Sequence, residues 1–125
     1  MAKRDSSDLE YQFHVTSGGV LTGHMGPISS LVTVSKSGFT ADSWHFVEFW
    51  HDSSSHTLFI DFDRSGSPGT ASTASAGLKS TKPVVIGQDN AFGNYHYGFV
   101  DELGLYSYIP PDVIRDGLYG GITPY

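Results

Sequence analysis

The chain has 125 residues, a formal net charge of −6 and no cysteine. The negative charge argues against a nucleic-acid backbone or an anionic membrane surface as the partner. The missing thiols exclude a disulfide framework and a cysteine nucleophile. Glycine (15 residues) and aromatic residues (14%) are frequent, and no long helical pattern occurs, which is typical of one all-β domain with many short turns.

The N-terminal stretch 1–8 is polar and charged, so we expect a loose polar arm. It does not have the pattern of a signal peptide, and no apolar run approaches membrane-spanning length. We therefore expect synthesis in the cytoplasm without a signal peptide, and no membrane insertion.

Three strands are expected next. Residues 9–16 alternate strictly, which predicts a strand with one side formed by Leu9, Tyr11, Phe13 and Val15. Two glycines then turn the chain into a second strand over 20–25. Gly26 and Pro27 end it, and a third strand is expected over 28–34.

The stretch 44–62 predicts the central hairpin of the domain. Two runs of apolar and aromatic residues flank a polar four-residue turn, Asp52 to Ser55. With this turn, the core face pairs Phe49 with Leu58, Val47 with Ile60 and His45 with Phe62. The other face pairs Trp50 with Thr57, Glu48 with Phe59 and Phe46 with Asp61. Because the second face is also rich in aromatic residues, we expect the hairpin to be buried or used on both faces.

The C-terminal half is expected to alternate loops with short strands. A surface loop with at most one weak strand fits 63–79, a short buried strand fits 83–87, and a polar loop fits 88–94. Residues 95–108 predict a strand in which Tyr97, Phe99, Leu103 and Leu105 share one face. One helix begins at Pro110-Pro111-Asp112, carries the apolar stripe Val113, Ile114 and Leu118, and ends at Gly120-Gly121.

Several motifs occur in the order found in one protein family. They are Ser43-Trp44-His45-Phe46-Val47, Thr57-Leu58-Phe59-Ile60-Asp61, Val84-Val85-Ile86-Gly87, and Tyr97-Gly98-Phe99-Val100-Asp101-Glu102-Leu103-Gly104-Leu105-Tyr106, with Leu118-Tyr119-Gly120-Gly121 at the end. Over residues 9–121 the chain resembles a laminin-G-like domain of the concanavalin A-like lectin/glucanase superfamily. The resemblance implies a single domain over 1–125, folded as an antiparallel β-sandwich of jelly-roll type with one short C-terminal helix.

Two features depart from the family pattern. Asp61-Phe62 stands where the family has Asp-Gly, and the first residues resemble a strand from the middle of the domain. The second departure indicates a shortened domain or a fragment. A shortened sandwich leaves strand edges unpaired, and native proteins cover such edges. We therefore expect a homo-oligomer or docking onto a larger protein assembly.

An enzyme of the glucanase type would need two carboxylates on one strand face. The Glu-x-Asp-x-x-Glu pattern of that branch is absent. Asp61 and Asp63 sit at a turn, and Asp101 and Glu102 point to opposite sides of their strand. We expect no catalysis.

Calcium is the metal that the sequence favours. Residues 61–66 match the opening of a calcium loop, with Ser72 in place of the closing acid. Asp89 offers oxygens from a neighbouring loop, as in calcium-binding members of the superfamily. Asp61, Asp63 and Asp89 are thus calcium candidates, and Asx turns explain the same residues without a metal.

The histidines offer a second, incomplete metal set. His51 and His56 flank the hairpin turn with Asp52 nearby, and an exposed polar pair is the alternative. His45 is expected to pack against the core.

Aromatic residues beside loops are candidates for stacking against sugar rings. The candidate ligand-binding residues are Trp50, Asn94, Tyr95 and Tyr97. Trp44 and Tyr106 lie in the packing motifs of the family and are expected in the core.

The expected function is therefore a non-catalytic binding or structural module on the surface of a larger assembly. Similar modules occur in phage virions, in tails and capsid decorations, so the resemblance implies a place on a virion surface or outside the cell, with possible glycan recognition. The alternative is a stand-alone carbohydrate-binding, lectin-like module, and a glycoside hydrolase is less favoured.

Overall fold

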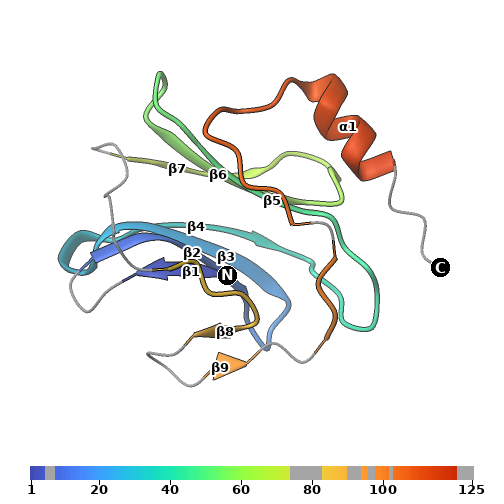
Figure 1. Ribbon diagram of the computed structural model, residues 1–125, viewed down its shortest axis with the longest axis horizontal. Helices are drawn as coiled ribbons and strands as arrows, with labels where there is room; N and C mark the ends of the chain where they lie inside the picture. Colours follow the sequence, from blue (N-terminus) through green and yellow to red (C-terminus); the bar gives the residue numbers. More distant parts are fainter. Residues whose placement is uncertain (5–7, 74–82, 90–93, 96–97, 102, 121–125) are drawn as a thin grey trace.

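The computed structural model describes residues 1–4, 8–73, 83–89, 94–95, 98–101 and 103–120. Two antiparallel sheets pack face to face, a four-stranded sheet in the order β1-β2-β3-β4 and a three-stranded sheet in the order β5-β6-β7 (Figure 1). The expected all-β sandwich with one short C-terminal helix is confirmed. Within the described ranges, no helix is long and apolar enough to cross a membrane.

The elements follow one another in chain order. They are β1 (Ala2–Arg4), β2 (Asp8–Val15), β3 (Val20–Pro27), a 3-10 turn (Ile28–Ser30), β4 (Val32–Ser37), β5 (Val47–Asp52), β6 (Thr57–Phe62), β7 (Gly69–Ser72), β8 (Gln88–Asp89), β9 (Asn94–Tyr95) and α1 (Asp112–Gly120). β8 and β9 pair only with each other.

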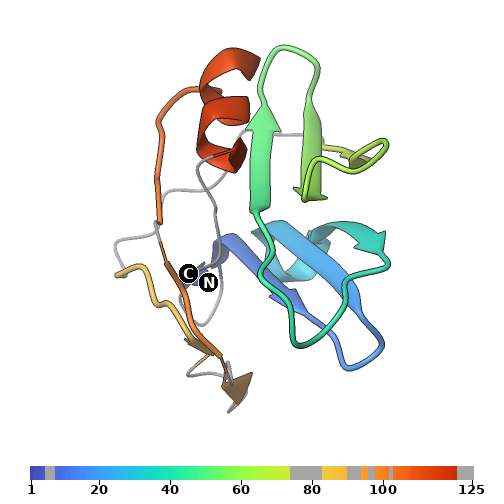
Figure 2. The same ribbon diagram turned by 90° about the vertical axis from the view of Figure 1, so that its right-hand side faces the viewer.

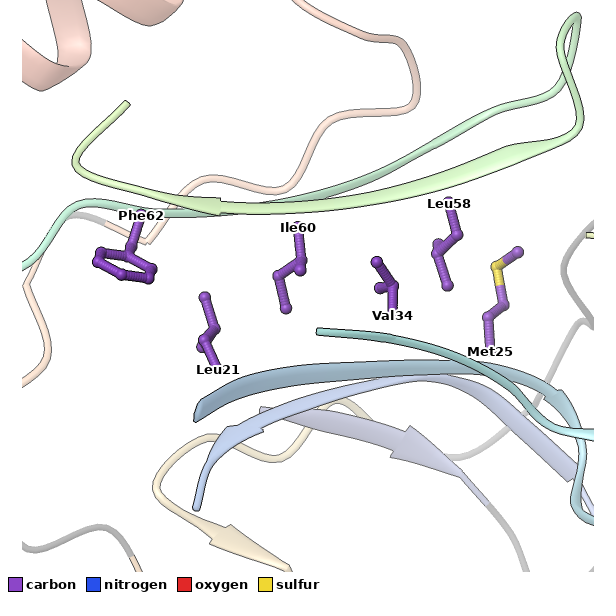
Figure 3. Close-up of a cluster of buried hydrophobic side chains, with 6 residues drawn as sticks. All are labelled: Leu21, Met25, Val34, Leu58, Ile60 and Phe62. Carbon is purple, nitrogen blue, oxygen red and sulfur yellow. The ribbon is translucent and has the colours of Figure 1, made fainter. Parts of the chain in front are cut away.

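The core lies between the two sheets and is built from alternate residues of facing strands. Six side chains make up its buried part (Figure 3): Leu21, Met25 and Val34 from the four-stranded sheet, and Leu58, Ile60 and Phe62 from β6. Burial of each such side chain stabilises the fold by about 1.5–3 kcal/mol. Burial of this cluster is the main interaction that holds the two sheets together.

Two glycines allow the sheets to approach closely. A Cβ at Gly23 would lie 2.4 Å from Cε2 of Phe49 and 3.1 Å from Cδ1 of Ile60. A Cβ at Gly69 would lie 2.2 Å from the carbonyl oxygen of Ser35. Since such distances are sterically forbidden, only glycine fits at these two positions in this packing.

The central hairpin forms, but its predicted register is wrong. Phe49 pairs with Ile60 and Trp50 with Phe59, so β6 is displaced along β5 by two residues from the predicted pairing. The turn is 53–56 and not 52–55, because Asp52 stays in β5 and its carboxylate accepts hydrogen bonds from the turn, while His56 adopts a left-handed φ of 49°. The shift keeps every residue on its predicted face.

Three predictions in the N-terminal half need correction. The polar arm contains β1, whose Ala2 is buried and pairs with β2. A bulge between Leu9 and Gln12 interrupts the alternation of β2, so Gln12 is buried although it was expected to face outward. The third strand starts at Val32 and not at residue 28, because the chain makes a 3-10 turn directly after Pro27.

The C-terminal half departs further from prediction. Residues 83–87 form only one bridge, between Val85 and Ala2, and two short strands occupy part of the expected loop 88–94. Of the expected strand 95–108, only Tyr95 lies in a strand among the described residues. Phe99, Leu103 and Leu105, which were expected to share one face of this strand, are all exposed, Phe99 by 87%. No described strand pairs with 98–101 or 103–108, so their alternating pattern has no ladder to join. The expected weak strand in 63–79 is β7, and the helix begins as predicted.

A substitution at Gly23 tests the close approach of the sheets. Gly23→Ala should lower the free energy of unfolding by about 1–3 kcal/mol, because the new methyl group overpacks the contact with Phe49. Urea denaturation measures this loss. Gly18→Ala is the matched control, since its Cβ would meet only Oγ1 of Thr16 at 3.8 Å. Equal midpoints for the two variants would contradict the steric constraint.

The hydrogen bonds within the turn predict an unusually low pKa for Asp52. The pKa of Asp52 is lowered to about 2 by the hydroxyl of Ser54, then by the hydroxyl of Ser55 and the backbone N–H of Ser54. Because the folded pKa is depressed, the stabilising effect is complete above the ordinary value of 3.8 and is lost as the pH falls through about 2. Ser54→Ala should raise the pKa toward 3.8, and Ser53→Ala should not, when both are followed by NMR titration. A wild-type Asp52 that titrates normally would refute this account of the turn.

Candidate functional site

Helix α1 lies beside β5 on the outer side of the three-stranded sheet (Figures 1 and 2). Val47 and Phe49 pack against the core, so Glu48 and Trp50 lie on the opposite face of β5. Arg115 of α1 contacts both of them. The prediction that the hairpin is used on both faces is thus confirmed.

Arg115 is held by a carboxylate and an indole ring. Its Nε donates to Oε1 of Glu48 at 2.6 Å, and its guanidinium carbon lies 4.4 Å from the centroid of the Trp50 ring. The Trp50 ring in turn stacks on Phe59, with centroids 4.9 Å apart and planes inclined by 3°. The side chains of Arg115 and Glu48 are only 13% and 10% exposed. The pKa of Arg115 is raised, chiefly by its hydrogen bond to Glu48, and burial opposes the rise.

The second oxygen of Glu48 has a different environment. Oε2 is buried and has no hydrogen-bond partner among the described residues. Nε of Arg64 lies 3.8 Å from it. The guanidinium of Arg64 instead bonds to Asp112 at 3.1 Å and Asp116 at 2.5 Å, both in the helix. We call Glu48, Trp50, Phe59, Arg64 and Arg115 the arginine cluster.

The helix therefore turns its polar side toward the sheet. The residues that contact the sheet or its loops recur at helical spacing: Asp112, Arg115, Asp116 and Tyr119. The predicted apolar stripe, Val113, Ile114 and Leu118, is exposed. No residue of α1 is buried. Ion pairs and aromatic contacts, not a buried apolar stripe, hold this helix in place.

The predicted calcium loop is engaged with side chains of the protein itself. Lys36 of β4 reaches across to the three-stranded sheet, where its ammonium donates to Oδ1 of Asp61 and, at 2.5 Å, to the carbonyl oxygen of Ser65. Asp63 accepts from the backbone N–H of Phe46 at 2.9 Å and bonds to Nδ1 of His45 at 2.5 Å. An internal ammonium group therefore takes two of the oxygens that a calcium ion would need.

The histidines do not assemble into a metal site in the described part of the chain. In the observed register His51 pairs with Leu58, and His56 belongs to the turn, so the predicted pairing of His51 with His56 is wrong. No three His, Asp or Glu side chains of the described residues gather closely enough to hold a metal ion. His45 packs between the rings of Phe39 and Phe62, as predicted. His14 of β2 and His24 of β3 stack on each other, which sequence reasoning missed.

The structure does not gather the predicted sugar-binding residues in one place. Trp50 belongs to the arginine cluster, whereas Asn94 and Tyr95 lie in β9, on the opposite side of the molecule from α1 in both views (Figures 1 and 2). The side chains of Asn94 and Tyr95, and all of Tyr97, lie outside the described part of the structure. Asp89, the third calcium candidate, lies in β8 beside them, away from Asp61 and Asp63.

The expectation of buried Trp44 and Tyr106 is wrong. Their side chains are 51% and 49% exposed, because Trp44 precedes β5 in an irregular loop and Tyr106 lies in a segment that joins no described strand. Sequence reasoning also missed the roles of Glu48, Arg64 and Arg115. The alternation of β5 placed Glu48 and Trp50 on one face, but nothing in the sequence indicated which distant cation would meet them.

A laminin G family model, described as the concanavalin A-like lectin/glucanases superfamily, matches residues 1–110 of the chain. The chain belongs to this superfamily. No curated protein and no solved structure matches the chain significantly.

Membership of the concanavalin A-like superfamily explains the β-sandwich but not its use, because the superfamily includes lectins and glucanases. The match ends at residue 110, two residues before α1 begins. The helix and Arg115 therefore lie outside the matched part of the chain. The arginine cluster joins α1 to strands β5 and β6 of the matched part.

The ion pair between Lys36 and Asp61 predicts a strong effect of removing one partner. Both side chains are largely buried, at 12% and 7% exposed. Lys36→Met should lower the free energy of unfolding by about 3 kcal/mol, because it leaves the buried carboxylate without a cation. Chemical denaturation measures the loss. The double variant Lys36→Met/Asp61→Asn should regain part of it, and a single variant as stable as the wild type would contradict this role for the pair.

Proposed function

We propose that the chain is a non-catalytic structural and binding module that assembles with further copies of itself, as a surface component of a larger protein assembly. One observation carries the proposal. The described residues between 99 and 118 expose ten large apolar side chains, each at least 36% accessible. They form what we call the apolar surface: Phe99, Val100, Leu103, Leu105, Tyr106, Tyr108, Ile109, Val113, Ile114 and Leu118.

The apolar surface gathers ten large exposed apolar side chains from one stretch of the chain. Single exposed apolar residues are common, but contiguous patches beyond a few hundred Å² mark interaction sites. Here the segment 103–109 leads toward α1 (Figure 1). The helix adds the exposed side chains of Val113, Ile114 and Leu118. A second copy supplies a partner of the same chemistry, and two-fold association is the commonest way to cover such a surface.

The arrangement of the acids supports the non-catalytic part of the proposal. Retaining glycosidases need two carboxyl groups about 5 Å apart and accessible to the sugar. Here Asp61, Asp63 and Glu48 are engaged with Lys36, His45 and Arg115 respectively. The virion setting is supported by the resemblance to phage structural modules.

A lectin-like module is the second candidate, favoured by one feature of the apolar surface. Tyr106 and Tyr108 are both exposed and meet edge to face, with centroids 6.0 Å apart. Exposed rings of this kind suit the apolar faces of sugars. Trp50 is less suited, since Phe59 and Arg115 already contact its ring.

The mass of the chain in solution tests the proposal. The wild type should form an oligomer at micromolar concentration by light scattering, and Val113→Ser/Leu118→Ser should shift it to a monomer, because the change removes apolar area from the centre of the contact. The helix should persist, since serine and valine have similar helix propensities and the exchange of leucine for serine costs at most about 0.7 kcal/mol.

Leu31→Ser is the matched control. Leu31 is also exposed but lies between the 3-10 turn and β4, outside the apolar surface, so this variant should keep the wild-type mass. A wild type that stays monomeric at all concentrations would overturn self-assembly. If that monomer bound members of a glycan array, the lectin-like function would take its place.

A further inference from the structure

We propose that Glu48, Trp50 and Phe59 form a binding site for the guanidinium group of an arginine side chain presented by a partner protein, and that Arg115 occupies this site in the unbound chain. This goes beyond the proposed function, because it concerns the opposite side of α1 from the apolar surface and a different ligand chemistry.

The site has the two groups that suit guanidinium recognition. A carboxylate pairs with its N–H donors, and an aromatic face attracts its delocalised charge. Arg115 shows that this geometry is satisfied here, with Nε 2.6 Å from Oε1 of Glu48 and the guanidinium carbon 4.4 Å from the Trp50 centroid. The parallel contact with Phe59 fixes the plane of the indole. The site is thus formed by rigid neighbouring strands of one sheet.

Arg115 uses the site incompletely. Only its Nε bonds to Glu48, and its Nη1 turns instead to Asp112 of its own helix at 3.3 Å. Oε2 of Glu48 stays buried with no hydrogen-bond partner among the described residues, and Arg64 lies 3.8 Å from it. A carboxylate accepts an arginine most strongly when both oxygens bond to the fork of donors. An incoming arginine that reaches both oxygens has more to gain than Arg115 has.

The helix that carries Arg115 is held in a way that permits release. None of its residues is buried, and its other contacts to the sheet are the ion pairs of Arg64 with Asp112 and Asp116 and the ring contact of Tyr119 with Phe46. Asp112 and Asp116 are 77% and 66% exposed, so their pairs with Arg64 contribute little to stability. Displacing α1 would uncover no apolar core.

The net charge of the chain favours a cationic ligand. Close to the site, Asp61 is paired with Lys36, and Arg64 lies near Glu48. The chain as a whole carries a net charge of −6. This field attracts a basic segment of a partner and speeds its encounter. Lysine fits less well than arginine, since a compact ammonium cannot bond both oxygens of Glu48 in a fork or stack flat on Trp50.

Trp50 provides a direct readout of the site. The chain has two tryptophans, so Trp44→Phe leaves Trp50 as the single fluorophore. In this background Arg115→Ala vacates the site, and N-acetyl-arginine amide is the probe. We expect the probe to change Trp50 fluorescence and raise the melting temperature of the Arg115→Ala variant. We also expect binding at least roughly tenfold tighter than to the same background with Arg115 present, since Arg115 competes for the site there.

Three comparisons make the test selective. Glu48→Gln added to the Arg115→Ala variant should abolish the response, whereas Asp42→Asn, which removes an exposed carboxylate from a loop, should leave it intact. N-acetyl-lysine amide, with its ε-amine unmodified, should bind several-fold more weakly than the arginine probe. Arg115→Gln repeats the experiment with a side chain of similar length, should the alanine variant unfold.

Two results would overturn the inference. One is an unchanged fluorescence and melting temperature of both Arg115 variants at saturating probe. The other is an equal response with Glu48→Gln or with the lysine probe, which would indicate a nonspecific cation effect. The arginine test reads Trp50 fluorescence, whereas the assembly test reads the mass of the chain in solution. A negative result in the arginine test therefore does not contradict self-assembly through the apolar surface. A negative result in the assembly test does not contradict the arginine site.

Discussion

The close approach of the two sheets is the constraint on which the rest of the structure depends. Gly23 admits the ring of Phe49, and Gly69 admits the backbone at Ser35, so the core side chains meet without a gap between the layers. The same distance allows Lys36, rooted in β4, to reach Asp61 at the end of β6. A sandwich with a wider spacing would lose both the apolar contacts and this buried ion pair, because neither set of side chains could bridge the difference.

Helix α1 is oriented the opposite way from the sheets, which turn their apolar sides toward the core. The polar side of α1 contacts Glu48, Arg64 and the indole of Trp50, and its apolar stripe faces solvent. Burying Val113, Ile114 and Leu118 would stabilise the fold by up to roughly 1.5–3 kcal/mol for each side chain. Exposed ion pairs stabilise a fold by much less than that. The orientation is therefore a poor solution for an isolated chain, and it becomes a good one when a second molecule covers the stripe.

The limits of sequence reasoning follow from the range of the contacts. The alternation of 47–52 and 57–62 correctly indicated which residues face the core, because side-chain direction is a local property of a strand. The predicted register was wrong by two residues, because the register depends on hydrogen bonds within the turn at Asp52. The strand expected over 95–108 failed because a pattern cannot supply a partner strand. The arginine cluster joins residues 48 and 115, and no local pattern encodes such a pairing.

The two sides of α1 connect the proposed assembly to the proposed arginine site. A molecule that packs on Val113 and Leu118 acts on the same rigid element that carries Arg115 into the site beside Trp50. If packing holds the helix away from the sheet, the site opens; if packing presses the helix onto the sheet, the site closes. In either case thermodynamic linkage is reciprocal. An arginine ligand must therefore change the affinity of assembly by the same factor by which assembly changes the affinity for arginine. No residue of α1 is buried, and the core lies between the two sheets. The sandwich can therefore keep its fold whichever position the helix takes.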